Sequence, residues 1–174
     1  MNDRVRIPNT SDINQGTHSE RTVALQFTAN EVTSRQVLYE EGGTVRGLNI
    51  YIDNGMLYIG GWNIPETGWD PTFMSIPIVA GQEYSVAFVL DGTNMVQPGA
   101  LTGYLNGTAF NSVAGSQINN HPGGIGLGGI NNHTIFHDGA SNSNNGFNFG
   151  GTIDNFAIYN RPLDATEINT LANQ

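Results

Sequence analysis

The stretch FGGTIDNFAIYNRPL, residues 149–163, decides the fold of this chain. Its Ile, Phe and Tyr residues over positions 151–159 predict a β-strand, because aromatic and β-branched side chains favour a pleated surface. The pattern Asp164-Ala-Thr-Glu167 follows directly and is typical of a helix N-terminus with a capping box. Ile168 and Leu171 give that short helix one apolar stripe. We therefore expect the chain to end in a strand and then a short helix.

Short runs of Val, Ile, Tyr and Phe, separated by Gly, Pro and Asn, extend the strand pattern through the rest of the chain. Asn54-Gly55 and Asn106-Gly107 predict two tight hairpins, because Asn and Gly tolerate the positive φ values of such turns. Residues 83–90 are apolar on both faces, which predicts a strand in the middle of a sandwich. Together these signals predict an all-β fold. The other predicted strands cover residues 4–7, 22–28, 36–40, 47–52, 56–62, 73–78, 101–105, 108–113 and 123–129.

Two segments carry no clear strand pattern and are predicted to be loops. Residues 62–71 contain both tryptophans, Trp62 and Trp69. Residues 131–148 are polar and too long for a simple connection, which is typical of a loop with a function.

The composition excludes several classes of protein. The chain has 174 residues, a net charge of −9, no Lys and six Arg, so it offers no basic patch for nucleic acid. An acidic surface suits a divalent cation, but it can also serve solubility alone. There is no Cys, which removes disulfides, Cys-zinc sites and thiol catalysis. The sequence contains no run of about 18 apolar residues, so it predicts no membrane-spanning helix. Its first residues lack the apolar region of a signal peptide.

The closing stretch resembles the last strand of laminin-G-like jelly rolls of the concanavalin A-like superfamily. The family pattern there is roughly F-x-G-x-I-D-E-V-x-I-Y-N-R-x-L, followed by a short helix, and this chain departs at Asn155, where Glu is usual. Other segments agree in order: DRVRIPN (3–9), VLYEEGG (37–43), NIYIDNG (49–55) and FHDG (136–139). The resemblance implies one domain over residues 1–174, an antiparallel two-sheet β-sandwich (jelly roll) with a short C-terminal helix.

The resemblance also implies a binding function. Members are mostly building blocks of large bacterial surface proteins, adhesins, secreted hydrolases or eukaryotic matrix proteins. They usually bind carbohydrate, sometimes protein, and often have calcium nearby. We therefore expect a monomeric module of a longer extracellular or bacterial surface protein, with a glycan or a cell-surface protein as partner. A fold alone does not establish such a function.

The same superfamily contains glucanases, so the spacing of the carboxylates decides whether this chain is expected to be catalytic. Those enzymes carry an E-x-D-x-E or E-x-D-x-x-E run on one strand, and glycoside hydrolysis with retention needs two carboxyl groups about 5 Å apart. This chain has no such run. Glu40 and Glu41 are adjacent, so in a strand they would face opposite sides. The sequence predicts a non-catalytic module, and a polysaccharide hydrolase is the less favoured alternative.

Asp154 is the predicted calcium ligand. In the sandwich glucanases that this chain resembles, the matching carboxylate holds a structural calcium together with backbone carbonyls. Calcium accepts carboxylate and carbonyl oxygens readily. The resemblance implies that Asp3 and Gly43 would supply the carbonyls here. The alternative is that Asp154 forms an ion pair with Arg4 or Arg161.

A second set of candidates would bind the glycan. Asn and Asp side chains, with His, form directional hydrogen bonds to sugar hydroxyls. An exposed Trp can stack on a sugar ring. The alternatives are a solvated loop for the polar residues and a place in the core for the tryptophans. The predicted ligand-binding residues are Asp138, His137, Asn131, Asn132, His121 and Trp69.

Overall fold

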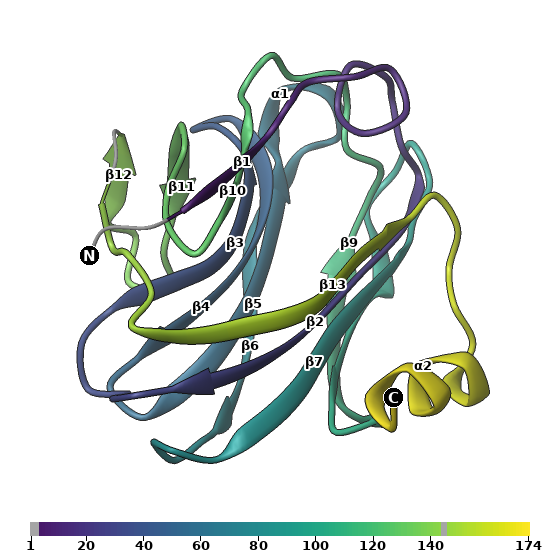
Figure 1. The fold of residues 1–174 in the computed structure, drawn as a ribbon. Coiled ribbons are helices and arrows are strands. Elements are labelled where there is room, and N and C mark those ends of the chain that lie inside the picture. Colours follow the sequence, from purple (N-terminus) through teal and green to yellow (C-terminus); the bar gives the residue numbers. More distant parts are fainter. Residues whose placement is uncertain (1–3, 144–145) are drawn as a thin grey trace.

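Two antiparallel sheets pack face to face in this chain (Figure 1). The computed structural model describes residues 4–143 and 146–174. The first sheet has the order β1 (Val5–Ile7), β10 (Ile125–Leu127), β3 (Gln36–Gly42), β4 (Arg46–Asp53), β5 (Met56–Asn63), β6 (Trp69–Pro77). The second has the order β13 (Gly151–Tyr159), β2 (Glu20–Ala29), β7 (Glu83–Asp91), β8 (Gln97–Leu105), β9 (Thr108–Gly115). The predicted two-sheet β-sandwich is confirmed.

The core lies between the two sheets and follows the period of two along each strand. On β4, Leu48, Ile50 and Ile52 are fully buried there, and β5 adds Leu57 and Ile59. From the second sheet the inward side chains are Val23, Leu25 and Phe27 of β2, with Val86, Phe88 and Leu90 of β7. The central place of β7 in its sheet agrees with its predicted apolar character on both faces.

A buried ion pair joins the two sheets across this core. Arg21 of β2 donates to Glu41 of β3, with Nη1 2.7 Å from Oε2, and both side chains are at most 1 % exposed. The hydroxyl of Tyr39 donates to the same carboxylate at 2.8 Å. The two opposite charges therefore neutralise each other inside the sandwich, although neither side chain is accessible to water and Arg21 Nε has no hydrogen-bond partner among the described residues.

The C-terminal helix α2 (Ala165–Ala172) covers the outer face of the second sheet. The Asp164 side chain accepts hydrogen bonds from the backbone N–H groups of Thr166 and Glu167, and the Glu167 carboxylate accepts one from the Asp164 backbone N–H, so the predicted capping box is present. Ile168 packs with Leu163 on that face. Figure 1 shows the helix lying beside the second sheet. The strand predicted at residues 151–159 coincides with β13.

Both predicted Asn-Gly hairpins are confirmed. Asn54 and Gly55 have φ values of 49° and 79°, and Asn106 and Gly107 have 49° and 78°. Such left-handed pairs match the twist of the strands they join. No helix in the described part of the chain is long and apolar enough to cross a membrane.

Residues 62–71 are not the loop that the sequence predicts. Trp62 lies in β5 and Trp69 begins β6, and between them stands the one-turn helix α1 (Ile64–Thr67), which Gly68 ends with a φ of 71°. A Cβ on Gly61 would lie 2.4 Å from the Trp69 ring, so the missing side chain makes room for the indole. Both tryptophans are therefore buried in β-structure.

The predicted loop at residues 131–148 contains further structure. Its first part forms β11 (His133–Ile135) and β12 (Ser141–Ser143), which pair as a small antiparallel sheet. Figure 1 shows this sheet standing outside the sandwich, and β11 contacts β3 and β4. The segment therefore covers part of the outer face of the first sheet.

Candidate functional site

The outer face of the first sheet carries polar and aromatic side chains. Because inward positions on β4 and β5 are aliphatic, the alternate positions place Asn49, Tyr51 and Tyr58 outward. The strand register sets Tyr51 opposite Tyr58, and it sets Asn49 opposite Gly60, which faces Phe73 of β6. This row of aromatic and amide groups forms the floor of the candidate site.

Residues 130–137, which we call the covering segment, lie along one side of this floor. Ile130 and Phe136 pack against Val37 and Tyr51 in a separate apolar cluster. The amide of Asn49 donates to Thr134 Oγ1 and to the Ile135 carbonyl, both at 2.8 Å. The covering segment is therefore fixed to the sheet by packing and by hydrogen bonds.

Glu40 of β3 fixes the covering segment through hydrogen bonds to its backbone. Its carboxylate is fully buried and accepts the backbone N–H of Asn131 at 2.9 Å and that of His133 at 3.4 Å. Burial raises the pKa of Glu40 from 4.5 to about 7, against the opposing effect of these backbone donors. Glu41 points to the other side of β3, as the alternation predicts, so the adjacent carboxylates do not act on one substrate.

Three rings stack where the covering segment ends. Tyr51 and Tyr58 have ring centroids 4.9 Å apart at an interplanar angle of 7°, and Tyr58 and His137 have centroids 4.1 Å apart at 12°. The Tyr51 hydroxyl accepts the His137 backbone N–H at 2.8 Å and lies 2.9 Å from Nδ1 of the same residue. Burial raises the pKa of both tyrosines, so their hydroxyls stay protonated. His137 is exposed and Tyr58 is half-buried, so the stack faces solvent.

An arginine between two carboxylates borders the stack. Nη2 of Arg35 lies 2.6 Å from Asp53 and 2.8 Å from Asp138, and the guanidinium sits 4.4 Å over the Phe136 ring. The hydrogen bond from Arg35 lowers the pKa of Asp138. These groups offer a ligand both donors and acceptors beside aromatic faces. We define the stack and this triad, Tyr51, Tyr58, His137, Arg35, Asp53 and Asp138, as the aromatic site.

The structure brings only two of the predicted ligand-binding residues, His137 and Asp138, into the aromatic site. Asn132 is exposed, and its amide donates to the Gly42 carbonyl at 2.8 Å, while Asn131 meets Glu40 through its backbone. His121 is 3 % exposed, with Nδ1 3.3 Å from the Gly123 carbonyl. The predicted set is therefore spread over several places and does not form one site.

Trp69 is a correction. Its side chain is 1 % exposed and belongs to the main core cluster, and its Nε1 donates to Thr72 Oγ1 at 2.9 Å. A ring with no accessible face cannot stack on a sugar. The alternative interpretation, a tryptophan in the core, is the one that the structure supports.

The predicted calcium ligands lie in separate parts of the fold. Asp3 lies outside the described residues. Asp154 is exposed on β13 and accepts the Asn155 N–H at 2.9 Å. Gly43 follows β3 of the opposite sheet, and its carbonyl accepts from Trp62 Nε1 at 3.0 Å. Over residues 4–143 and 146–174, no group of three or more His, Asp or Glu residues could hold a metal ion.

The predicted alternative, an ion pair of Asp154 with an arginine, is also missing from the described part of the chain. Arg161 pairs with Glu167, with Nη2 2.6 Å from Oε1. Arg4 instead donates to the Ile130 carbonyl. Asp154 therefore keeps a solvent-facing carboxylate on an irregular part of β13, where the register shifts.

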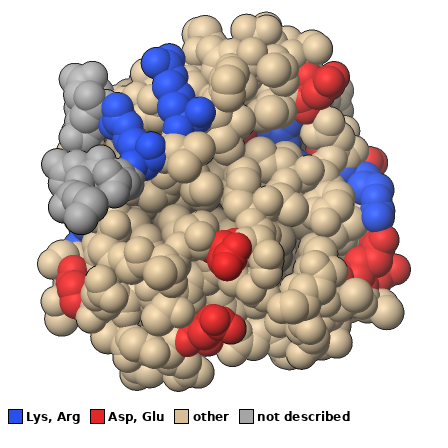
Figure 2. Space-filling view, in the orientation of Figure 1, with Lys and Arg blue, Asp and Glu red and all other residues tan. Residues whose placement is uncertain are grey.

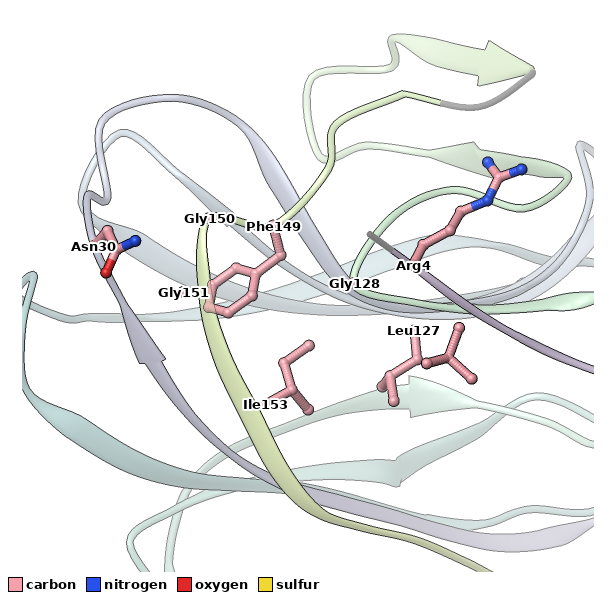
Figure 3. A pocket seen from close by; sticks show the side chains of 9 residues that line it. Arg4, Asn30, Leu127, Gly128, Phe149, Gly150, Gly151 and Ile153 are labelled. Atoms are coloured by element: carbon pink, nitrogen blue, oxygen red, sulfur yellow. The ribbon is translucent and has the colours of Figure 1, made fainter. Parts of the chain in front are cut away.

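A pocket separate from the aromatic site opens at the side of the sandwich. It has a volume of about 520 Å³ and lies between the β1–β10 edge of one sheet and β13 of the other. Leu127, Phe149 and Ile153 point into it, as Figure 3 shows. Among the predicted ligand-binding and metal residues that the structure describes, none lines this pocket.

The sandwich, its closing strand and its terminal helix are matched by a known family. Residues 1–169 match the laminin-G-type family model described as the concanavalin A-like lectin/glucanases superfamily. The chain belongs to this superfamily. The resemblance stated from the closing stretch is thereby confirmed, and it extends over nearly the whole chain. None of the curated protein sequences matches this laminin-G-like chain.

Solved structures share the fold at low sequence identity. A heptameric SAP-like pentraxin from Limulus polyphemus has a TM-score of 0.60 and 16 % identity, covering 97 % of this chain and 81 % of its own. Domain 4 of AbnA, an extracellular arabinanase from Geobacillus stearothermophilus in complex with arabinotriose, has 0.65 and 17 %, covering 97 % and 72 %. The Ruminococcus gnavus sialidase CBM40 bound to α2,3 sialyllactose has 0.61 and 17 %, covering 89 % and 83 %. These similarities show a shared laminin-G-like fold.

Sequence reasoning missed Tyr58, Asn49 and Arg35 of this laminin-G-like domain. Tyr58 and Asn49 lie in predicted strands, which were interpreted only through their inward, apolar residues. Their signal was available, since an Asn and two Tyr alternate with Leu and Ile along β4 and β5. Arg35 carried no such signal, because its partner Asp138 is 103 positions away.

Proposed function

We propose that this chain is a non-catalytic, lectin-like module that binds a glycan at the aromatic site. The observation that carries the proposal is the stack of Tyr51, Tyr58 and His137, which faces solvent beside the Arg35 triad. Aromatic faces suit the C–H faces of sugar rings, and fixed donors and acceptors suit their hydroxyls. The sugars named with the arabinanase domain and with CBM40 support the same class of ligand.

The non-catalytic part of the proposal rests on the carboxylates. Hydrolysis of a glycoside needs a carboxyl pair that flanks the scissile bond. Here Asp53 and Asp138 are both held by Arg35, and Glu40 is enclosed by backbone N–H groups. The hydrogen bond from Arg35 lowers the pKa of Asp138, so this carboxylate does not suit the role of proton donor. We place the module in a larger extracellular protein, such as a bacterial adhesin, because superfamily members that the sequence resembles serve there.

Loss of the Tyr58 ring tests the proposed site. We expect Tyr58→Ala to weaken binding of the best ligand from a glycan array by about tenfold or more, the effect of losing a central aromatic contact worth about 1.4 kcal/mol. Isothermal titration calorimetry gives the dissociation constants. Tyr104→Ala is the matched control, since Tyr104 is a half-buried tyrosine packed with the α2 cluster on the second sheet.

Three results would count against the aromatic site. The first is unchanged affinity of Tyr58→Ala, and the second is an equal loss in Tyr104→Ala. The third is an array without any bound glycan together with tight binding of a defined protein partner, which would establish the protein-binding alternative. Turnover of a polysaccharide would instead contradict the non-catalytic assignment.

A calcium ion held through Asp154 is a separate part of the proposal. Only the exposed carboxylate of Asp154 supports it, because Gly43 follows β3 of the opposite sheet and does not complete the site. A metal that binds only the folded state adds about 2.7 kcal/mol of stability at a hundredfold excess over its dissociation constant. We expect a chelator to lower the melting temperature by several degrees, and we expect Asp154→Ala to abolish this response.

Differential scanning fluorimetry with calcium and with chelator measures that response. Asp70→Ala is a suitable control, since Asp70 is another exposed aspartate of a strand. A melting temperature that does not change on addition of the chelator would remove calcium from the proposal. The proposed glycan binding at the aromatic site would not be affected by that result.

A further inference from the structure

Two arginines lie at the edge strand β1, with Arg4 directly before the strand and Arg6 at its middle. Val5 lines the side pocket and Ile7 packs against the core, so Arg6 between them points to the outer face of the first sheet. The Arg4 residue borders the side pocket too, but its guanidinium reaches the Ile130 carbonyl of the covering segment. Figure 3 agrees, since the guanidinium of Arg4 points away from Leu127. The pair is therefore presented to solvent rather than to the core.

Backbone and amide groups gather around this pair. Arg4 Nη1 donates to the Ile130 carbonyl at 2.7 Å, which fixes the stem of that side chain. A Cβ on Gly124 would lie 2.2 Å from Asn131 Nδ2 and 3.5 Å from Arg6 Nε. The amide of Asn131 and the guanidinium of Arg6 thus converge over Gly124, and both groups carry N–H donors.

The other four arginines are occupied by carboxylates. They form the pairs Arg21–Glu41, Arg35–Asp53, Arg46–Glu66 and Arg161–Glu167. Within residues 4–143 and 146–174, neither Arg4 nor Arg6 has a carboxylate within 4.0 Å, although the chain carries a net charge of −9. Figure 2 shows two neighbouring basic side chains over the edge where β1 lies. Two adjacent like charges repel each other, and an anion between them would relieve that repulsion.

We propose that Arg4, Arg6 and Asn131 form an oxyanion site that binds a carboxylate or sulfate group carried by an acidic sugar. A guanidinium matches the two oxygens of such a group with paired N–H donors. The Asn131 amide supplies a further donor from the covering segment. The oxyanion site lies on the β1 side of the first sheet, while Tyr58 lies on β5, with β10, β3 and β4 between them. It therefore adds a second binding point beyond the proposed aromatic site.

The test is a titration of the full chain followed by NMR. Sodium glucuronate and sodium sulfate are added at constant ionic strength against sodium chloride, with glucose as the neutral probe. We expect saturable shifts of the Arg6 Nε–H and Asn131 side-chain signals with both anions and none with glucose. Arg6→Gln should weaken the anion affinity by about tenfold, since a hydrogen bond to a charged group is lost.

Arg161→Gln is the matched control, because it removes the same charge from an exposed arginine near α2. It should leave the anion affinity unchanged. A uronic-acid tetrasaccharide and a sulfated tetrasaccharide then distinguish the two sources of the oxyanion. The proposal is overturned if neither anion gives saturable shifts, if glucose shifts the same signals, or if Arg161→Gln loses as much affinity as Arg6→Gln. Since no probe here depends on Tyr58, failure of this site leaves the glycan proposal standing.

Discussion

Arg21→Met is expected to lower the free energy of unfolding by about 3–5 kcal/mol, because it leaves a buried carboxylate without its cation. Glu41 is fully buried, and the Tyr39 hydroxyl would be its remaining side-chain donor. Packing cannot offset this loss, since an unpaired charge inside a sandwich costs far more than an apolar contact returns. Urea unfolding followed by tryptophan fluorescence measures the change.

Two further variants separate the charge effect from general damage. Arg161→Met breaks an exposed ion pair and should cost at most about 1 kcal/mol. The double variant Arg21→Met/Glu41→Leu removes both charges, and it should recover much of the stability that the single variant loses. A loss below about 1 kcal/mol in Arg21→Met, or a double variant less stable than the single one, would contradict the assigned role of the pair.

The second large effect concerns pH and Glu40. Burial raises the pKa of Glu40 to about 7, whereas the unfolded chain titrates near 4.5. Between these values the folded protein keeps a proton that the unfolded chain releases, so this carboxyl makes the free energy of unfolding fall as pH rises. At about 1.4 kcal/mol per unit the fall amounts to about 3 kcal/mol, complete above pH 7.

The side chain in Glu40→Gln cannot ionise, so the free energy of unfolding of this variant should lack that decrease with pH. We therefore expect the variant to gain about 3 kcal/mol relative to the parent chain between pH 4 and pH 8, measured as the difference of two urea unfolding series. Both proteins share every other titrating group, so the difference isolates Glu40. Parallel stability curves over this range would show that the carboxyl is not penalised by burial.

Glu31→Gln provides a control of opposite sign. Hydrogen bonds from Ser34 and Thr33 lower the pKa of Glu31 to about 2. This carboxylate stabilises the fold above pH 4.5, and the contribution is lost as pH falls toward 2. The variant should therefore be less stable than the parent chain at neutral pH and should approach it in acid.

Local signals in the sequence predicted most of the fold. The capping box at Asp164 and the two Asn-Gly turns depend on residues at most three positions apart, so short-range patterns were sufficient. The segment at residues 62–71 failed for the opposite reason. The place of Trp69 depends on Gly61 of the neighbouring strand, whose missing side chain leaves room for the indole.

The candidate site was predicted only in part. His137 and Asp138 were found because a motif near them resembles the family. Their partners Tyr51 and Tyr58 come from β4 and β5, and Arg35 directly precedes β3, so only the tertiary fold brings them together. His121 and Trp69 have suitable chemistry, but burial removes them from any ligand.

The sequence by itself determined most of the strands, the two Asn-Gly hairpins, the closing strand with its helix, and the superfamily, because each depends on neighbouring residues or on a contiguous motif. Only the tertiary structure decided which groups meet. Glu40 accepts from the backbone of Asn131, 91 positions away, and Arg35 pairs with Asp138 across 103 positions. Such contacts arise from the packing of a covering segment on a finished sheet, and no pattern of spacing along the chain encodes them.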